Sequence, residues 1–272
     1  MDCGPCGEKL ESASEKYLNL FNECFVEIKL LFGDLLRNPN LNVNEKSPAE
    51  FVTNFEFIIE NKIRKIIQIY FPDDSIRGEE LPEYHGSSRR VWYIDPVDGT
   101  NNFIRGRRDI CVSIGLAIDE QPVAGLIILP YRKAYVAVSN TDKDQILFGL
   151  GTNLASEDPH LPVMIGLPAK GIKKHINVLL KDKKLITCRI TGAIGFDLVT
   201  MAIGQLDVRL GGEFKEVDVV AGVAIVRAFG GKVFNERGDE WKVGDQQLIA
   251  FRNNDVLGKI LGICDFSELV GG

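Results

Sequence analysis

The sequence lacks the features that mark membrane, secreted and nucleic-acid-binding proteins. No apolar run reaches the length of about 18 to 20 residues that a membrane span needs, and the N-terminus has no apolar signal core. Positive charge is not in excess, because 32 lysines and arginines stand against 38 aspartates and glutamates, for a net charge of −6. This balance excludes binding to nucleic acid or to an anionic membrane through the overall charge of the protein. We therefore expect a cytoplasmic protein.

The sequence has six cysteines, and only Cys3 and Cys6 form a pattern. Their CGPC spacing matches a thioredoxin-type redox pair, but that chemistry needs a preceding strand, and here the motif begins at residue 3. A surface disulfide or a metal site is the alternative to a simple tail, and we expect residues 1–7 to be a flexible tail. The other cysteines lie in apolar segments, as reduced and buried cysteines do, at Cys24, Cys111, Cys188 and Cys264.

The chain is long enough to bury a sizeable core, with 272 residues of which 45% are hydrophobic. We expect one domain over residues 8–265. Its first half, about 8–145, should hold helices and a sheet with a metal site, and its second half, 146–265, should form the αβ substrate side. The glycines and prolines of residues 140–170 mark the division, and the sequence shows no internal repeat.

Helical spacing predicts an amphipathic helix over residues 9–36 and, after a loop over residues 38–47, a second helix up to Tyr70. Ser47-Pro48 followed by Glu50 has the pattern of a capped helix start. Short β-branched and aromatic runs with short links then predict a mixed, largely antiparallel sheet. These runs are residues 91–94, 111–118, 123–129 and 134–139.

The second half alternates helices with strands. The predicted helices are residues 172–180, 192–204 and 217–229, and the predicted strands are residues 184–189, 206–210, 232–235 and 248–251. Residues 217–229 are apolar nearly all round, which predicts a helix buried between layers. Asp255 is expected to cap a last helix.

The densest polar signal is DPVDGT, residues 95–100, directly after the apolar run 91–94. A strand would deliver Asp95 and Asp98 to one edge of a sheet, where the carbonyl of Val97 can join them. Such a set of hard oxygen ligands suits magnesium or manganese. The alternative is a turn that ends the strand, because Asp, Pro and Gly are common turn residues.

Two further acidic positions stand out. The Glu79-Glu80 pair follows Gly78 after a short strand-like run, and it can supply another carboxylate or be merely solvated. Asp218 is the first acidic residue of the apolar segment 217–229. A carboxylate beside buried surface needs a partner, which can be the N-terminus of its own helix or a metal.

Taken together, the segments GEE (78–80), DPVDGTNNF (95–103) and VDVVAG (217–222) appear in the order and spacing of the inositol monophosphatase superfamily, which this chain resembles from its first helix to its last. The resemblance implies an α/β fold of the layered αβαβα sandwich type. It also implies lithium-sensitive hydrolysis of a phosphate monoester, with two or three Mg²⁺ ions per active site.

Carried over to this sequence, the resemblance implies roles for individual residues. The metal ligands would be Glu79, Asp95, the Val97 carbonyl, Asp98 and Asp218. Glu79 and Thr100 would position the attacking water, and Glu56 stands where the family has an aspartate that holds this threonine. The amides of Gly99 and Thr100 would bind phosphate oxygens.

The residues on the substrate side follow the family less closely. Gly192, Ala193 and Ile194 match its segment beside the substrate, but Gly211 replaces a glutamate that helps to hold an inositol hydroxyl, and Val217 replaces a common tryptophan. Basic residues near this segment and after Phe103 could bind a second phosphate or could form an exposed basic loop. They are Arg189, Arg105, Arg107 and Arg108.

We therefore expect a phosphatase that attacks a small sugar or polyol phosphate with a metal-activated water. Inositol monophosphate and fructose 1,6-bisphosphate are close to equal as substrates, and the expected assembly is a homodimer without nucleic acid or membrane partners. The alternatives are a nucleotide 3′-phosphatase acting on phosphoadenosine phosphate and a non-catalytic binding module that keeps the fold.

Overall fold

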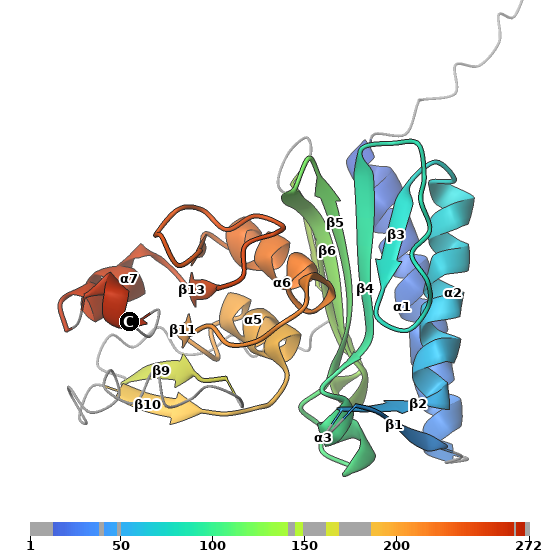
Figure 1. Cartoon of the computed structure of the whole chain (residues 1–272), viewed down its shortest axis with the longest axis horizontal. Coiled ribbons are helices and arrows are strands. Elements are labelled where there is room, and N and C mark those ends of the chain that lie inside the picture. The colour runs from blue at the N-terminus through green and yellow to red at the C-terminus, as the bar shows by residue number, and fades with distance from the viewer. Residues whose placement is uncertain are drawn as a thin grey trace, which may run out of the picture.

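The computed structural model describes residues 13–37, 41–47, 50–140, 145–148, 162–168, 186–263 and 265–269. The expected tail over residues 1–7, with Cys3 and Cys6, and the helix expected over residues 172–180 lie outside these residues. The described elements are stacked in the order helix pair, sheet, helix pair, sheet, helices, which confirms the expected αβαβα sandwich (Figure 1).

The first sheet has six strands in the order β3-β4-β5-β6-β7-β8. They are β3 (Ser75–Gly78), β4 (Arg90–Asp98), β5 (Cys111–Ile118), β6 (Gln121–Leu129), β7 (Ala134–Ser139) and β8 (Gln145–Phe148). Strand β3 runs parallel to β4, and the other neighbouring pairs are antiparallel. The prediction of a mixed, largely antiparallel sheet is confirmed.

Helices α1 (Ala13–Arg37) and α2 (Asn54–Tyr70) cover one face of this sheet (Figure 1). Tyr17 and Phe21 on the apolar side of α1 form T-shaped ring contacts with Trp92 from β4, at ring-centroid distances of 6.0 and 6.1 Å. All three side chains are buried. Burial of such large rings is a major source of stabilisation for this layer.

The segment between α1 and α2 differs from the prediction. The predicted loop over residues 38–47 contains a strand, and α2 begins at Asn54 instead of after Ser47. The two strands of the resulting hairpin are β1 (Val43–Ser47) and β2 (Glu50–Thr53). The Glu56 carboxylate accepts a hydrogen bond from the Thr53 backbone N–H. The T-x-x-E pattern of Thr53 and Glu56 therefore begins the helix, whereas Ser47 and Glu50 of the earlier S-x-x-E pattern belong to the two strands of the hairpin.

Helices α5 (Ile194–Ala202) and α6 (Glu216–Ala228) form the layer between the two large sheets (Figure 1). Helix α6 is buried along most of its length, as its apolar sequence predicts. It lies directly on the first sheet, because a Cβ on Gly115 or on Gly125 would come within 2.6 Å of the Ala221 backbone. Glycine at these two strand positions permits the close approach of helix and sheet.

The second sheet has five strands in the order β10-β9-β11-β13-β12. They are β9 (Val163–Gly166), β10 (Ile186–Arg189), β11 (Val208–Arg209), β12 (Lys232–Phe234) and β13 (Ile249–Phe251). Helices α7 (Asn254–Leu261) and α8 (Phe266–Leu269) follow it. The cap of α7 is Asn253, whose side chain accepts from the Val256 N–H at 2.9 Å, so the prediction that Asp255 caps this helix is wrong. Asp255 instead lies within the first turn.

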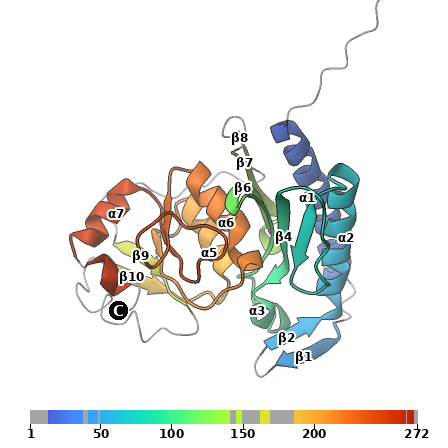
Figure 2. The ribbon, with the colours of Figure 1, turned by 45° about the horizontal axis from the view of Figure 1, so that its top comes forward.

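The short helix α3 (Thr100–Ile104) follows β4 and lies beside the β1–β2 hairpin (Figure 2). A 3₁₀ turn, η1 (Pro130–Arg132), joins β6 to β7. Among the described helices, none is both long and apolar enough to cross a membrane.

Candidate active site

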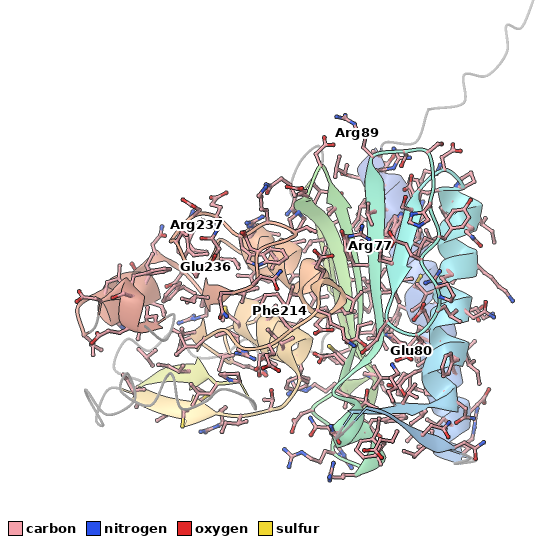
Figure 3. The ribbon with its side chains drawn as sticks, in the orientation of Figure 1. Arg77, Glu80, Arg89, Phe214, Glu236 and Arg237 are labelled. Carbon is pink, nitrogen blue, oxygen red and sulfur yellow. The ribbon has the colours of Figure 1, made fainter. Side chains whose placement is uncertain are left out.

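A cavity of about 370 Å³ lies where β4, α3 and the N-terminal ends of α5 and α6 meet. Its lining includes most of the positions that the sequence singled out, namely Glu79, Asp95, Val97, Asp98, Gly99, Thr100, Gly192, Ala193, Ile194 and Asp218. The other lining residues are Lys46, Phe51, Asn101, Pro168, Arg209, Glu213, Phe214 and Lys215. Phe214 lies just before α6, on the α5–α6 side of the first sheet (Figure 3).

Three carboxylates converge at one side of the cavity. Glu79 directly follows β3, Asp95 lies in β4, and Asp218 lies in the first turn of α6. Each offers an oxygen atom, and the three oxygens lie within 4.8 Å of one another. The parallel pairing of β3 with β4 aligns Gly78 with Ile94, which brings Glu79 and Asp95 to the same end of the sheet. Oxygen donors alone make up this cluster, which is the ligand chemistry that Mg²⁺ prefers.

Burial and mutual repulsion make this cluster costly to ionise. Burial raises the pKa of Asp95 well above its usual range, and the charges of Glu79, Asp98 and Asp218 raise it further. Burial and the neighbouring Asp218 raise the pKa of Asp98 to about 8. Burial also raises the pKa of Asp218 to about 7, and Glu79 adds to that rise. A divalent cation would offset this repulsion, so the site fits a metal in charge as well as in ligand type.

Asp98 joins the first sheet to helix α5. Its Oδ2 accepts hydrogen bonds from the backbone N–H groups of Gly195 at 2.6 Å and of Phe196 at 3.3 Å. Asp98 thus serves as an N-terminal cap for a helix from another part of the chain. A Cβ on Gly195 would lie 3.0 Å from both Asp98 Oδ2 and Cys111 Sγ, so glycine permits this close contact.

Thr100 and Glu56 form a second polar unit beside the carboxylates. The Thr100 hydroxyl donates to Glu56 Oε1 at 2.7 Å, and it lies 3.2 Å from the Val97 carbonyl oxygen. Glu56 is fully buried, and this burial raises its pKa, while hydrogen bonds from Thr100 and Thr53 lower it. Glu56 thus makes the contact with Thr100 that the family resemblance assigns to an aspartate, whose side chain is one methylene shorter. Gly99 permits the turn into α3, since its φ is +92°.

Lys215 is a cavity residue that sequence reasoning missed. Its Nζ lies 2.8 Å from Glu79 Oε1, and its backbone N–H donates to Asp218 Oδ2 at 2.7 Å. Lys46 from the β1–β2 hairpin also lines the cavity, and its Nζ lies 2.5 Å from Glu80 Oε1. A lone lysine in a loop gives no sequence signal of its role, so only the folded arrangement reveals these two cations.

The four arginines expected to bind a second phosphate do not line this cavity. All four side chains are exposed. The four residues are Arg105, Arg107, Arg108 and Arg189. Arg105 donates to Asn101, and Arg107 pairs with Asp109 at 2.9 Å. Their proposed role stays a prediction. Arg209 from β11 lines the cavity instead, and its side chain is only 5% exposed. Its Nε lies 2.8 Å from Asp197 Oδ2.

Comparison with known proteins gives a consistent result. The model of the inositol monophosphatase family matches residues 24–266. The chain is 31% identical over 214 residues to a fructose-1,6-bisphosphatase/inositol-1-monophosphatase of Aquifex aeolicus, covering 75% of this chain and 79% of that relative. It is 28% identical over 238 residues to inositol monophosphatase 1 of Solanum lycopersicum, covering 80% of this chain and 85% of that one.

Among solved structures, the extragenic suppressor protein suhB from Bartonella henselae has the same fold. The TM-score is 0.80 at 22% identity, and the match covers 93% of this chain and 98% of that one. The extent of the family match and the identity to the Aquifex relative together decide the assignment. This chain belongs to the inositol monophosphatase family.

Proposed function

We propose that this phosphoric monoester hydrolase uses Mg²⁺ to cleave a small sugar or polyol phosphate, with inositol monophosphate and fructose 1,6-bisphosphate as its substrates. Family membership supports the reaction class, and the name of the Aquifex relative combines the two activities. The observation that carries the proposal is the cluster of Glu79, Asp95 and Asp218 in the wall of a cavity that also contains Thr100.

The residues that would hold the metal are the three clustered carboxylates together with Asp98 and the Val97 carbonyl. When bound, Mg²⁺ would lower the pKa of a water molecule and stabilise negative charge on the phosphoryl oxygens. The fit rests on the donor set, which contains only oxygen atoms, and on the raised pKa values of Asp95, Asp98 and Asp218.

The Thr100–Glu56 pair would handle the proton of the attacking water. Because the Thr100 hydroxyl donates its proton to Glu56 Oε1, its oxygen lone pairs can accept a hydrogen bond from water. The buried Glu56 carboxylate has a raised pKa, which favours its taking up a proton through Thr100 during attack. The backbone N–H groups of Gly99 and Thr100 begin α3 at the cavity wall, where they would bind phosphate oxygens.

Other residues of the cavity lining would bind the rest of the substrate. Gly192, Ala193 and Ile194 line the cavity, and the buried Arg209 guanidinium, whose Nε lies 2.8 Å from Asp197 Oδ2, adds a positive charge. Its Nη1 donates to the Gly211 carbonyl at 3.2 Å. An arginine in the cavity lining suits an anionic group at the far end of a bisphosphate. The expected homodimer is part of this proposal and rests on the family resemblance alone.

The test is phosphate release by the purified protein at a series of Mg²⁺ concentrations, with a chelator as the metal-free control. The substrates are inositol 1-phosphate, fructose 1,6-bisphosphate and phosphoadenosine phosphate, compared by kcat/KM. Magnesium-dependent release from either of the first two supports the proposal. Preference for the nucleotide would reassign the substrate, and no release from any of them would indicate a binding module.

Lithium offers a second test of the same mechanism. The family resemblance implies inhibition by millimolar lithium at working Mg²⁺ concentrations. Lithium chloride and sodium chloride titrations of the active protein should therefore diverge. Identical curves would contradict the metal mechanism that the resemblance implies.

A further inference from the structure

The segment that follows Glu79 is held by a buried ion pair from helix α2. Glu60 is fully buried and Arg64 is 9% exposed, and Arg64 Nε donates to Glu60 Oε1 at 2.8 Å. Neither residue lines the cavity that contains Glu79. Glu80, the neighbour of Glu79, lies between β4 and α2, the helix that carries the pair (Figure 3).

Glu60 and Arg64 form hydrogen bonds with the backbone of consecutive residues. Glu60 accepts hydrogen bonds from the backbone N–H groups of Glu80 at 2.7 Å and of Leu81 at 3.1 Å. Arg64 donates to the carbonyl of Leu81 at 3.0 Å and to that of Pro82 at 2.9 Å. Four hydrogen bonds therefore fix three residues that have no regular secondary structure of their own.

The Glu60 carboxylate also packs against Gly78, the residue before Glu79. A Cβ on Gly78 would lie 1.9 Å from Glu60 Oε1, so glycine at this position lets the carboxylate reach the loop. Glu79 is itself tied to β4, because its backbone N–H donates to the Ile94 carbonyl at 3.1 Å. The backbone of Glu79 is thus fixed on one side by the sheet and on the other by Glu60.

Stability alone is a poor explanation for this arrangement. A buried ion pair gains little net stability, since desolvation of both charges offsets most of their attraction. The same two side chains, however, satisfy the backbone of a loop whose first residue belongs to the carboxylate cluster. Groups one step behind metal ligands orient those ligands, and their loss weakens metal binding.

We propose that Glu60 and Arg64 are positioning residues, which hold the Glu79 carboxylate where it can join Asp95 and Asp218 around a divalent cation. This inference rests on the cation site of the proposed function. It gives the pair a measurable effect on Mg²⁺ affinity, separate from any effect on folding.

Three substitutions test the pair at different strengths. Glu60→Gln keeps the size of the side chain but presents an amide N–H₂ to one of its donors, which leaves that contact unmade. Arg64→Met removes both bonds to the carbonyls. Arg64→Lys keeps the charge beside Glu60 but loses the planar fork that reaches two carbonyls, so it is the mildest variant and the one expected to fold best.

A matched control lies at the other end of β3. Asp74 is also fully buried, and it accepts from Arg90 Nε at 2.8 Å, from Ser88 Oγ at 2.8 Å and from Trp92 Nε1 at 2.9 Å. It precedes β3, whereas Glu79 follows that strand. Asp74→Asn should therefore lower the unfolding temperature without moving Glu79.

The experiment is titration calorimetry of Mg²⁺ into each metal-free protein, combined with thermal unfolding with and without Mg²⁺. Glu60→Gln and Arg64→Met should weaken Mg²⁺ binding by about 10- to 100-fold, and Arg64→Lys by less. The stabilisation by a given Mg²⁺ concentration should shrink in parallel. Activity of the variants should recover at higher Mg²⁺, as a rise in the KM for Mg²⁺ with a smaller change in kcat.

The outcomes separate this inference from the proposed function. Parent-like Mg²⁺ affinity in the folded Glu60 and Arg64 variants would overturn the positioning role and leave the proposed function intact. An equal loss of affinity in Asp74→Asn would also overturn it, since the effect would then follow stability. Failure of the parent protein to bind Mg²⁺ would overturn the cation site itself, and the inference with it.

Discussion

The cavity lining contains two groups of charged residues with opposite electrostatics, a carboxylate wall of Glu79, Asp95, Asp98 and Asp218 and an arginine wall of Arg209 with its partner Asp197. On the first wall, Asp95 and its neighbours are acids packed against acids, and burial and repulsion both raise the pKa of Asp95. On the second wall, burial lowers the pKa of Arg209, and Asp197, whose Oδ2 lies 2.8 Å from Arg209 Nε, opposes that effect. Lys215 balances only part of the negative charge of the first wall, whereas Asp197 is the counter-charge of Arg209 on the second.

The difference separates reaction from recognition. Clustered carboxylates whose negative charge Lys215 balances only in part would be completed by a bound metal, and such a site suits the chemistry of phosphoryl transfer. A guanidinium held in place by a buried carboxylate needs no added ion, and it suits the orientation of an anionic substrate. The following predictions test this division, beginning with the largest expected effect.

The carboxylate wall should fail outright when one acid is removed. Asp95→Asn should lower kcat/KM by at least about a thousandfold, which corresponds to roughly 4 kcal/mol of barrier, because it removes a proposed ligand. The metal-free variant should unfold at the same temperature as the parent or higher, since repulsion is relieved. Assays at saturating Mg²⁺ and calorimetry measure both quantities, and activity within about threefold of the parent would remove Asp95 from the mechanism.

The Thr100–Glu56 pair should affect catalysis without affecting metal binding. Glu56→Gln keeps a hydrogen-bond acceptor for Thr100 but cannot accept a proton, so kcat should fall by about a hundredfold. The Mg²⁺ concentration that gives half-maximal activity should change little. Steady-state kinetics across a Mg²⁺ series distinguish the two effects, and a selective loss of Mg²⁺ affinity would mean that Glu56 supports the metal site instead.

The arginine wall should affect substrates unequally. Arg209→Lys keeps a charge beside Asp197 but removes the planar fork, so kcat/KM on fructose 1,6-bisphosphate should fall by about tenfold or more. Activity on inositol 1-phosphate should fall by less than about threefold. Arg252→Lys is the matched control, because Arg252 also pairs with an aspartate, with its Nε 3.0 Å from Asp207 Oδ1, and lies outside the cavity. Equal losses on both substrates would contradict a role for Arg209 in reading a second anion.

The smallest expected effect is on stability as a function of pH. In the metal-free protein, the folded-state pKa values of Asp218 and Asp98, about 7 and about 8, lie above the ordinary value of 3.8. Between about pH 4 and pH 8 the folded state therefore binds more protons than the unfolded state, so these two groups make stability fall as pH rises. Their stabilising contribution is present below this window and lost above it.

Thermal unfolding in a chelator at pH 5, 6.5 and 8 measures this effect. The transition temperature should fall toward pH 8, and Asp218→Asn should flatten the trend because an amide does not titrate. Saturating Mg²⁺ should remove most of the slope. A trend that is the same in the parent and in Asp218→Asn would show that other groups control it.

Much of the fold could be read from local patterns. The strands β5 and β7 have the predicted bounds, and the apolar segment of α6 is a helix between two sheets. The errors occurred where two local signals competed. Both Ser47 and Thr53 precede a glutamate at capping distance, and strand pairing decided between them by using the first as part of a hairpin.

The sequence by itself determined the acidic cluster and the family, because each motif is contiguous and directly follows or begins a regular element. It did not reveal Arg209, Lys215 or the Glu60–Arg64 pair, since each is a single charged residue whose meaning depends on what packs against it. Tertiary structure decided those roles. It brought residues of β11 and β4 to one cavity, placed the start of α6 beside Glu79, and packed α2 against the loop after β3. Burial then gave these charges their importance, because a charge removed from water must be matched by a specific partner.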